Sequence, residues 1–287
     1  MTKPSIIITG ANGFIGESLV NHFVAKDWLV KAFVHSMPQN KLSGVEYVLY
    51  SLEKNPDERK FESVNYLVHC AYLKYEKNKN SDAVNLLGTK HLIDLCRKYT
   101  IKPLFLSSFS AHKDAESHYG KIKLESEKLF DISKDIILKP GFVIGKKGLS
   151  GQLIHRIKTN TFFPLVGGGK QPIQTICIDD LCLIVDNAFT NNMAGLFYIA
   201  ESEVISMKIF YQEIANQLNK KIKFISFSLP LLLFVCKVYE SVGISLPVSS
   251  ENVLGLKHLA KFDTKGDLNK MGIQIKGYKE SLKSILK

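Results

Sequence analysis

"SIIITGANGFIG" (residues 5–16) joins a run of isoleucines directly to three glycines. A short apolar run that ends in a turn is typical of a buried β-strand. The residues that follow, 14–27, carry Ile15, Leu19 and Phe23 at helical spacing. The chain is therefore predicted to begin with a strand, a glycine-rich turn and a helix.

The glycines of this turn, Gly10, Gly13 and Gly16, are spaced G-x-x-G-x-x-G. Gly10 permits a tight turn, Gly13 lets the backbone approach a pyrophosphate, and Gly16 lets the helix pack closely on the strand. The free N–H groups at the start of the helix would face the anion. We therefore predict a dinucleotide site here rather than an ordinary turn. The other turn residues expected to line that site are Asn12, Phe14 and Ile15.

Apolar runs alternate with helical patterns through the first half of the chain. The runs lie at 29–36, 45–52, 65–72, 103–110 and 135–145, and the helical patterns at 83–99 and 119–130. This alternation predicts βαβ units, and hence an α/β fold with a Rossmann-like, doubly wound parallel sheet. We expect residues 1–145 to form the dinucleotide-binding domain. Residues 146–287 should form a smaller, mainly substrate-binding α/β part, with segments around 172–200 returning to the first domain.

The formal net charge is +11, and it comes almost entirely from dispersed lysines, because the chain has only three arginines. No basic run with interleaved aromatic residues occurs, and no nucleic-acid motif is present. We therefore expect a lysine-rich surface that attracts an anionic substrate, and no nucleic-acid partner.

No apolar run reaches the roughly 18 residues that a membrane span requires. The longest, 229–236, is interrupted by Lys237, and with Val238, Tyr239 and Val242 it predicts an amphipathic helix. We expect this helix to pack in the core rather than on a membrane surface. The five cysteines have no paired spacing, so neither disulfides nor a metal site is expected. With no signal peptide recognised, a cytoplasmic location is expected.

The second predicted strand ends in His35 and Ser36, without an acidic residue. Proteins that bind NAD usually place Asp or Glu there, to accept a hydrogen bond from the ribose 2′-hydroxyl. A missing carboxylate removes the repulsion that a 2′-phosphate would meet. We therefore favour NADP(H) over NAD(H), with His35, together with Ser36 or Lys41, contacting the phosphate.

In chain order, several segments resemble motifs of the extended short-chain dehydrogenase/reductase superfamily, specifically the NAD-dependent epimerase/dehydratase family that acts on nucleotide sugars. They are "TGANGFIG" (9–16), "LVHCAYLK" (67–74), "VNLLGTKHLID" (84–94), "LSSFSA" (106–111), "YGKIKLESE" (119–127), "LKPGFVIG" (138–145) and "ICIDDL" (176–181). The resemblance implies a nucleotide-sugar substrate, and a homodimer is possible. It also implies that Ser108, Tyr119 and Lys123 are catalytic. Further cofactor contacts are implied at Ala71, Lys74, Asn85, Ser107 and Pro140, and for Tyr119 and Lys123 as well.

Three features depart from the family pattern. The acid after the second strand is missing, and Phe142 stands where many members have Asn. Phe109 and Ser110 follow Ser108, where the 4,6-dehydratases have Asp-Glu, so elimination of water is not expected.

The spacing of Tyr119 and Lys123 has a chemical reason. Residues four apart lie on one face of a helix. A free tyrosine has a pKa near ~10 and is a poor base at neutral pH. A neighbouring ammonium group lowers that pKa and makes the phenol an efficient acid or base. Lys123 could also hold the nicotinamide ribose, while Ser108 orients the reacting oxygen. By contrast, His69 is expected to be a core histidine rather than a base.

Three functions remain open from the sequence. The first, which we favour, is the reduction of a nucleotide-linked 4-keto sugar with a consumed cosubstrate. The second is a nucleotide-sugar 4-epimerase with tightly held NAD. The third is a non-catalytic, NAD(P)-binding regulatory protein on the same fold.

Overall fold

The computed structural model describes residues 3–75, 80–241, 249–257 and 259–286 of the 287-residue chain. The chain divides into two compact units. The first comprises Met1–Ser108, Ile122–Lys139 and Ile178–Phe197, and the second comprises Phe109–Lys121, Pro140–Cys177 and Tyr198–Lys287. The chain thus passes between the units several times, whereas the sequence suggested a main boundary at residue 145 and a return around 172–200.

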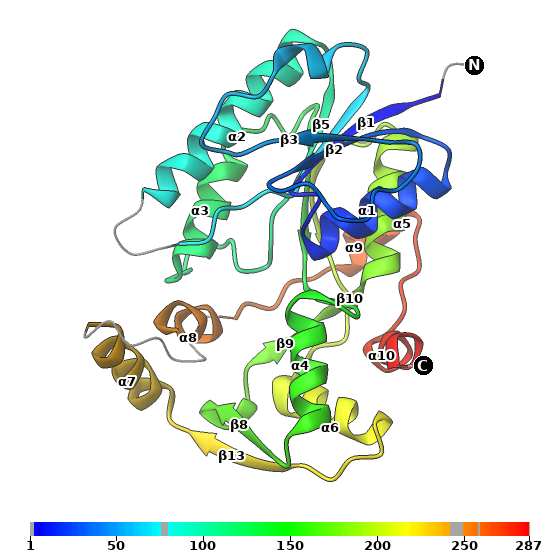
Figure 1. The fold of residues 1–287 in the computed structure, drawn as a ribbon. Helices are drawn as coiled ribbons and strands as arrows, with labels where there is room; N and C mark the ends of the chain where they lie inside the picture. Colours follow the sequence, from blue (N-terminus) through cyan, green and yellow to red (C-terminus); the bar gives the residue numbers. More distant parts are fainter. Residues whose placement is uncertain (1–2, 76–79, 242–248, 258, 287) are drawn as a thin grey trace. The chain divides into compact units, whose positions relative to one another are not determined.

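A seven-stranded sheet is the centre of the first unit (Figure 1). In spatial order its strands are β11 (Gly195–Ile199), β6 (Ile136–Pro140), β5 (Lys102–Leu106), β4 (Tyr66–His69), β1 (Ser5–Thr9), β2 (Leu29–Val34) and β3 (Val45–Leu49). Every pair from β3 to β6 is parallel. The order 3-2-1-4-5-6 is that of the Rossmann fold, so the predicted fold class is confirmed. In such sheets ligands bind beyond the carboxyl ends of the strands, where the order reverses, here between β1 and β4.

Helices cover both faces of this sheet, so its central strands are apolar on both sides. All five residues of β1 are buried. On one face α1 (Phe14–Ala25) packs beside α5 (Ile178–Thr190) (Figure 1). His22 Nε2 of α1 lies 3.2 Å from Asp186 Oδ2 of α5 and links the two helices.

The other face carries α2 (Ser81–Lys98) and the first-unit part of α3 (His118–Glu127). Its core joins Ile7 and Phe33 of the sheet to Leu92 of α2. A second cluster joins Phe105 of β5 to Phe130, just beyond α3.

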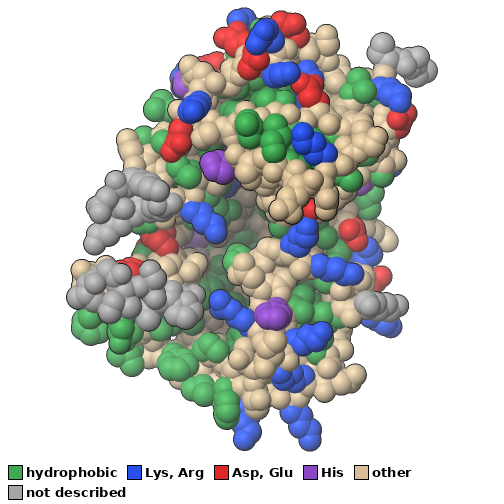
Figure 2. Space-filling view, viewed as in Figure 1, with side chains coloured by type: hydrophobic (Ala, Val, Ile, Leu, Met, Phe, Trp, Pro, Cys, Tyr) green, Lys and Arg blue, Asp and Glu red, His purple; other side chains and the backbone are tan. Residues whose placement is uncertain are grey.

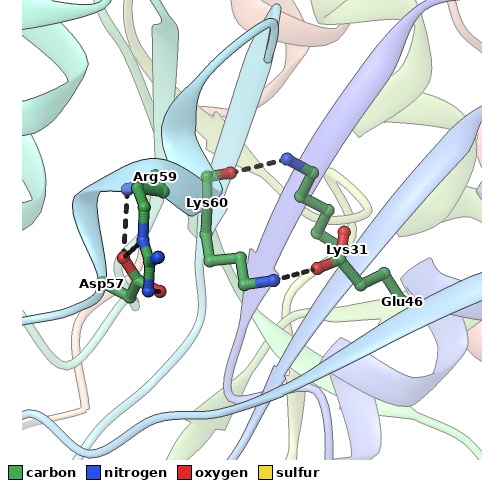
Figure 3. Close-up of polar contacts among 5 residues, drawn as sticks. All are labelled: Lys31, Glu46, Asp57, Arg59 and Lys60. Carbon is green, nitrogen blue, oxygen red and sulfur yellow. Dashed lines mark hydrogen bonds and ion pairs between the residues drawn. The ribbon is translucent and has the colours of Figure 1, made fainter.

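Polar contacts hold the short helix η1 (Glu58–Phe61) against the sheet edge (Figure 3). The Asp57 side chain caps η1 by accepting from the Arg59 backbone N–H at 3.2 Å. Lys60 Nζ donates to Glu46 Oε1 of β3 at 2.7 Å, and Lys31 Nζ of β2 donates to the Lys60 carbonyl at 2.8 Å. Strands β2 and β3, at one edge of the sheet, are thus both bonded to Lys60 of η1.

The predicted strand 135–145 is two strands, separated at Gly141. The Gly141 N–H donates to Ile199 O at 3.0 Å, and a Cβ at this position would lie 2.8 Å from Ala200 Cβ. Beyond it, β7 (Phe142–Ile144) leaves the large sheet and pairs with β10 (Thr175–Cys177).

The second unit is built from short strands and helices around its own core. Its remaining strands are β8 (Phe162–Val166), β9 (Pro172–Ile173), β12 (Ile205–Ser206) and β13 (Lys223–Phe227), and its one 3₁₀ turn in the described residues is η2 (Gly167–Gly169). Its helices are α4 (Gly148–Thr159), α6 (Met207–Gln217), α7 (Leu229–Ser241), α8 (Ser250–Lys257), α9 (Lys265–Met271) and α10 (Tyr278–Leu286). Ile157, Phe163, Phe210 and Leu282 bring α4, β8, α6 and α10 together in this core.

The prediction that the amphipathic helix at 229–242 packs in the core is wrong for α7. Cys236 is its one buried residue, and Leu231 and Phe234 are 60% and 66% exposed. Val242 lies outside the described residues. Among the residues that the structure describes, no helix has both the length and the apolar character to cross a membrane.

Candidate cofactor-binding and catalytic site

The glycine-rich turn between β1 and α1 is as tight as the sequence predicted. Gly10 has a φ of +67°, and a Cβ there would lie 2.8 Å from Ala71 N. A Cβ on Gly16 would collide with the Gly10 carbonyl. Both positions therefore require glycine, one for its conformation and the other for space. Gly13 has a φ of −77°, which any residue can adopt, so a substitution there tests space rather than backbone strain.

The start of α1 is arranged to receive an anion. Gly13 is its N-cap residue, and no side chain among the described residues caps the helix there. The N–H groups of the first turn, beginning at Phe14 and Ile15, therefore lack the side-chain acceptor that helix starts commonly have. This helix start lies beyond the carboxyl end of β1, next to the point where the strand order reverses. The residues present therefore fit a dinucleotide pyrophosphate.

Asn12 ties the turn to the end of β2. Its Oδ1 accepts from the His35 backbone N–H at 2.8 Å, and its Nδ2 donates to the Ser36 carbonyl at 3.0 Å. The predicted cofactor contact of Asn12 stays a prediction, and in the structure its amide binds the backbone of the next strand end. It thereby fixes the backbone from which the exposed side chains of His35 and Ser36 project.

Buried hydrogen bonds hold the end of β4 beside the glycine turn. Thr9 Oγ1 accepts from the Ala71 N–H at 3.2 Å and lies 2.8 Å from His69 Nδ1. His69 Nε2 lies 2.9 Å from Thr89 Oγ1 of α2. Burial, and then the charge of Lys123, lower the pKa of His69 to about 3. The prediction of a satisfied core histidine is confirmed.

Asn85 holds the segment that follows β4. Its Nδ2 donates to the Leu73 carbonyl at 2.8 Å, and its Oδ1 accepts from the Leu73 N–H at 2.9 Å. This bidentate clamp positions the chain between Ala71 and the exposed Lys74. The Asn85 side chain thus shapes this loop by binding the Leu73 backbone, a contact that the sequence motif alone did not reveal.

Lys123 is a buried ammonium group without a bonded carboxylate among the described residues. Its side chain donates from Nζ to the Leu106 carbonyl at 2.6 Å and lies 4.5 Å from the centre of the Phe105 ring. The residue is 4% exposed. Burial lowers its pKa to about 8, against the weaker opposing effects of Cys70 and Glu127. Such a group has unused hydrogen-bonding capacity and a charge that water does not screen.

Sequence reasoning missed a second buried lysine, Lys139 on β6. Its Nζ lies 2.9 Å from Glu127 Oε1, and both side chains are almost fully buried. Ser107 also donates to Glu127 Oε1. The hydroxyl of Ser107, predicted to bind the cofactor, thus belongs to this network. The signal was present, because Glu127 ends the "YGKIKLESE" motif and Lys139 begins "KPG".

The remaining predicted residues lie where the chain passes between the units. Ser108 ends the first segment of the first unit, whereas Tyr119 and Pro140 belong to the second. Tyr119 is in the first turn of α3, 36% exposed, and Lys123 follows one turn later on the same helix. Gly120 lets this helix start pack closely, because a Cβ there would collide with the Ser110 carbonyl.

The second unit has a basic hollow on the first turns of α4. Its volume is about 360 Å³. Its basic lining residues are Lys146, Lys147, His155 and Arg156. A hollow lined in this way favours an anion.

A model of the NAD dependent epimerase/dehydratase family matches residues 6–196, about two thirds of the chain. The chain belongs to this family. The match spans the glycine turn, Ser108 and the Tyr119–Lys123 pair. The family contains nucleotide-sugar epimerases, dehydratases and reductases that use a nicotinamide cofactor, and the chain is accordingly assigned to a family of enzymes.

Individual relatives are more distant. A UDP-glucose 4-epimerase of Vibrio cholerae is 23% identical over 271 residues, covering 82% of this chain and 81% of that protein. The Helicobacter pylori ADP-L-glycero-D-manno-heptose-6-epimerase has a similar fold, with a TM-score of 0.76, 15% identity, and coverage of 99% and 95%. A Bacillus anthracis dTDP-4-dehydrorhamnose reductase in complex with NADP gives a TM-score of 0.71, 16% identity, and coverage of 99% of each chain. At this identity the two structures support the fold alone.

Proposed function

We propose that the chain reduces a nucleotide-linked 4-keto sugar with NADPH, using Tyr119 as the general acid. The observation that carries the proposal is the buried ammonium of Lys123, one helical turn after Tyr119 and bonded to a carbonyl rather than a carboxylate. A buried charge is costly, and a protein that only bound the cofactor would not need one a helical turn after a tyrosine, where it lowers the pKa of the phenol. The regulatory function is therefore disfavoured.

Each residue would have a separate task. When bound, the reduced nicotinamide supplies a hydride to the carbonyl carbon. Tyr119 would donate its proton to the carbonyl oxygen, and Ser108 would hold that oxygen by a hydrogen bond. The Lys123 ammonium would stabilise the phenolate that remains and bind the nicotinamide ribose. Gly10, Gly13 and the start of α1 would hold the pyrophosphate.

The substrate would be held by the second unit. The basic hollow on α4 supports an anionic diphosphate there, with Lys146 and Arg156 as the expected contacts. The glycine-rich η2 and Lys170 offer further N–H groups and charge. Arg156→Gln should raise KM for the nucleotide sugar about tenfold and leave kcat nearly unchanged. The reason is that Arg156 would bind the diphosphate equally in the ground state and the transition state. Lys3→Gln, a change at an exposed lysine of the first unit, is the control.

The preference for NADPH rests on the end of β2. His35 and Ser36 stand there without a carboxylate, and Asn12 fixes their backbone. His35→Asp should shift the ratio of kcat/KM values toward NADH several-fold. An unchanged ratio would show that His35 does not contact the 2′-phosphate of the cofactor.

A 4-epimerase is the second candidate, because the Vibrio cholerae relative has that activity. The two are separated by supplying UDP- and dTDP-linked 4-keto-6-deoxy sugars with each reduced cofactor and following nicotinamide absorbance. Stoichiometric NADPH consumption supports the reductase. Interconversion of two 4-epimers without net oxidation of the cofactor supports the epimerase and overturns the proposal.

Cofactor binding has its own test. Gly13→Val introduces a branched side chain where the pyrophosphate would lie, at a φ that valine adopts, and its Cβ would also lie 3.1 Å from the Gly10 carbonyl oxygen. Calorimetry should show loss of dinucleotide binding in a variant that still folds. Unchanged affinity would show that the glycine turn has no ligand.

A further inference from the structure

The ribbon of β8 and β13 in the second unit carries apolar side chains on both faces. The strands are parallel and in register, so Phe162 stands beside Lys223, and Phe227 beside Val166. On the inner face Phe163 and Leu165 are buried. On the outer face Phe162, Ile225 and Phe227 are 57%, 45% and 42% exposed. Surface strands normally alternate between apolar and polar residues, whereas on this outer face Lys223 is the one polar side chain of the two strands.

The helix that directly follows β13 continues this exposed apolar surface. Leu231, Phe234 and Val238 of α7 have the spacing i, i+3, i+7, which places them on one side of the helix, and all three are exposed. In Figure 2 hydrophobic side chains gather over α7 and β13 at the lower left. We call the set Phe162, Ile225, Phe227, Leu231, Phe234 and Val238 the α7–β13 surface. Contiguous exposed apolar surface of this kind marks an interaction site.

The segments that carry the α7–β13 surface are mainly basic, and Glu213 and Glu240 stand at the two ends of one of them. Residues 214–239 contain four lysines and no Asp or Glu, and residues 140–177 contain five Lys or Arg and no Asp or Glu. Lys223 Nζ lies 6.0 Å from the centre of the Phe162 ring. Within the described residues, Lys220, Lys221, Lys223 and Lys237 form no ion pair. By contrast, lysines of the first unit such as Lys60 and Lys90 pair with carboxylates at 2.7 Å.

We propose that the α7–β13 surface docks the protein on an anionic lipid membrane. Aromatic and aliphatic side chains enter the boundary between headgroups and acyl chains, and unpaired lysines beside them bind anionic headgroups. A second copy of the chain fits this surface less well. A two-fold dimer would bring the same four lysines of each copy together, and like charges facing each other oppose association.

The test is co-sedimentation of the full chain with vesicles of phosphatidylcholine alone or with added phosphatidylglycerol. The wild-type protein should bind the anionic vesicles and be released as salt is raised. Leu231→Ser with Phe234→Ser should lower the partition coefficient at least tenfold. The matched control is Leu87→Ser with Ile132→Ser, since these side chains of the first unit are 56% and 58% exposed. That control should bind as the wild type does.

A second pair of variants tests the charges. Lys220→Gln with Lys221→Gln should lower binding by about fivefold for each charge removed, since each lysine near an anionic surface contributes about 1 kcal/mol. Lys90→Gln, in the first unit, is the control. Failure of the wild type to bind anionic vesicles overturns the proposal, as does full binding by the Leu231→Ser/Phe234→Ser variant. A wild-type dimer that this double variant converts to monomer would assign the surface to a second copy and also overturn it.

Discussion

Two buried lysines of the first unit, Lys123 and Lys139, have opposite surroundings. Lys139 on β6 lies 2.9 Å from Glu127, so its charge is neutralised within the fold. Lys123 on α3 donates to the Leu106 carbonyl and lies over the Phe105 ring, and burial lowers its pKa to about 8. Lys123 is 4% exposed and Lys139 is 2% exposed. Burial is therefore the same for both lysines, and the bonded partner is the basis on which we propose a structural role for Lys139 and a functional one for Lys123.

The two lysines differ in the group that offsets the cost of burying their charge. A paired charge is compensated within the folded protein, so replacing that lysine should lower the stability of the fold. An unpaired ammonium is compensated only when a ligand or a reacting group approaches, so its loss should be felt in activity.

The largest expected effect concerns the residue that Lys123 is proposed to serve. Tyr119→Phe should lower kcat by ~10²–10⁴-fold, because proton transfer by a positioned side chain contributes about that much. The cofactor dissociation constant should stay within a few-fold, because the hydroxyl is not needed to hold the dinucleotide. Steady-state kinetics and calorimetry measure the two. Retention of most of kcat would show that another group transfers the proton.

Lys139→Met should lower the free energy of unfolding by about 3–5 kcal/mol, because it leaves the Glu127 carboxylate buried without its partner. Denaturant unfolding measures the change. The double variant Lys139→Met/Glu127→Met removes both charges and should recover most of the loss. If the single variant is as stable as the wild type, the pair contributes nothing to the fold.

A smaller effect is expected in the pH dependence of stability. The pKa of Lys123 is about 8 in the folded protein and 10.5 ordinarily. Below pH 8 the group is charged in both states, and the full cost of burying that charge is present. Between these values the unfolded chain binds more protons than the folded protein, so stability should rise with pH. Lys123→Met removes this group, so its unfolding free energy should rise less steeply over that range. Parallel curves would contradict the lowered pKa.

Local patterns predicted much of the first unit. The glycine spacing of Gly10 and Gly16 reflects constraints within a few residues of one turn, and the alternation of elements reflects one repeated unit. The identity of His69 as a core residue followed from its apolar strand. These features depend on nearby sequence, so they could be found without the structure.

Other features depend on residues that are distant in sequence. Glu127 and Lys139 come from different elements, and only the packing of α3 against β6 makes them a pair. Asn85 and Asn12 were recognised as motif residues, yet their hydrogen bonds to Leu73 and to His35 come from the folded loops. The exposure of α7 was predicted wrongly. Its composition suits a core, and no local signal tells whether a partner element covers it.

Kinetics and denaturant unfolding of Lys123→Met and Lys139→Met, measured side by side, test the contrast between the two lysines most directly. Lys123→Met should be at least as stable as the wild type at pH 7, since the cost of burying an unpaired charge is removed. Its kcat/KM should fall at least ~10²-fold, because the charge beside the acid/base is lost. Lys139→Met should lose several kcal/mol of stability and keep near-normal activity per folded molecule. An active Lys123→Met, or a folded and inactive Lys139→Met, would contradict the assignment of the two roles.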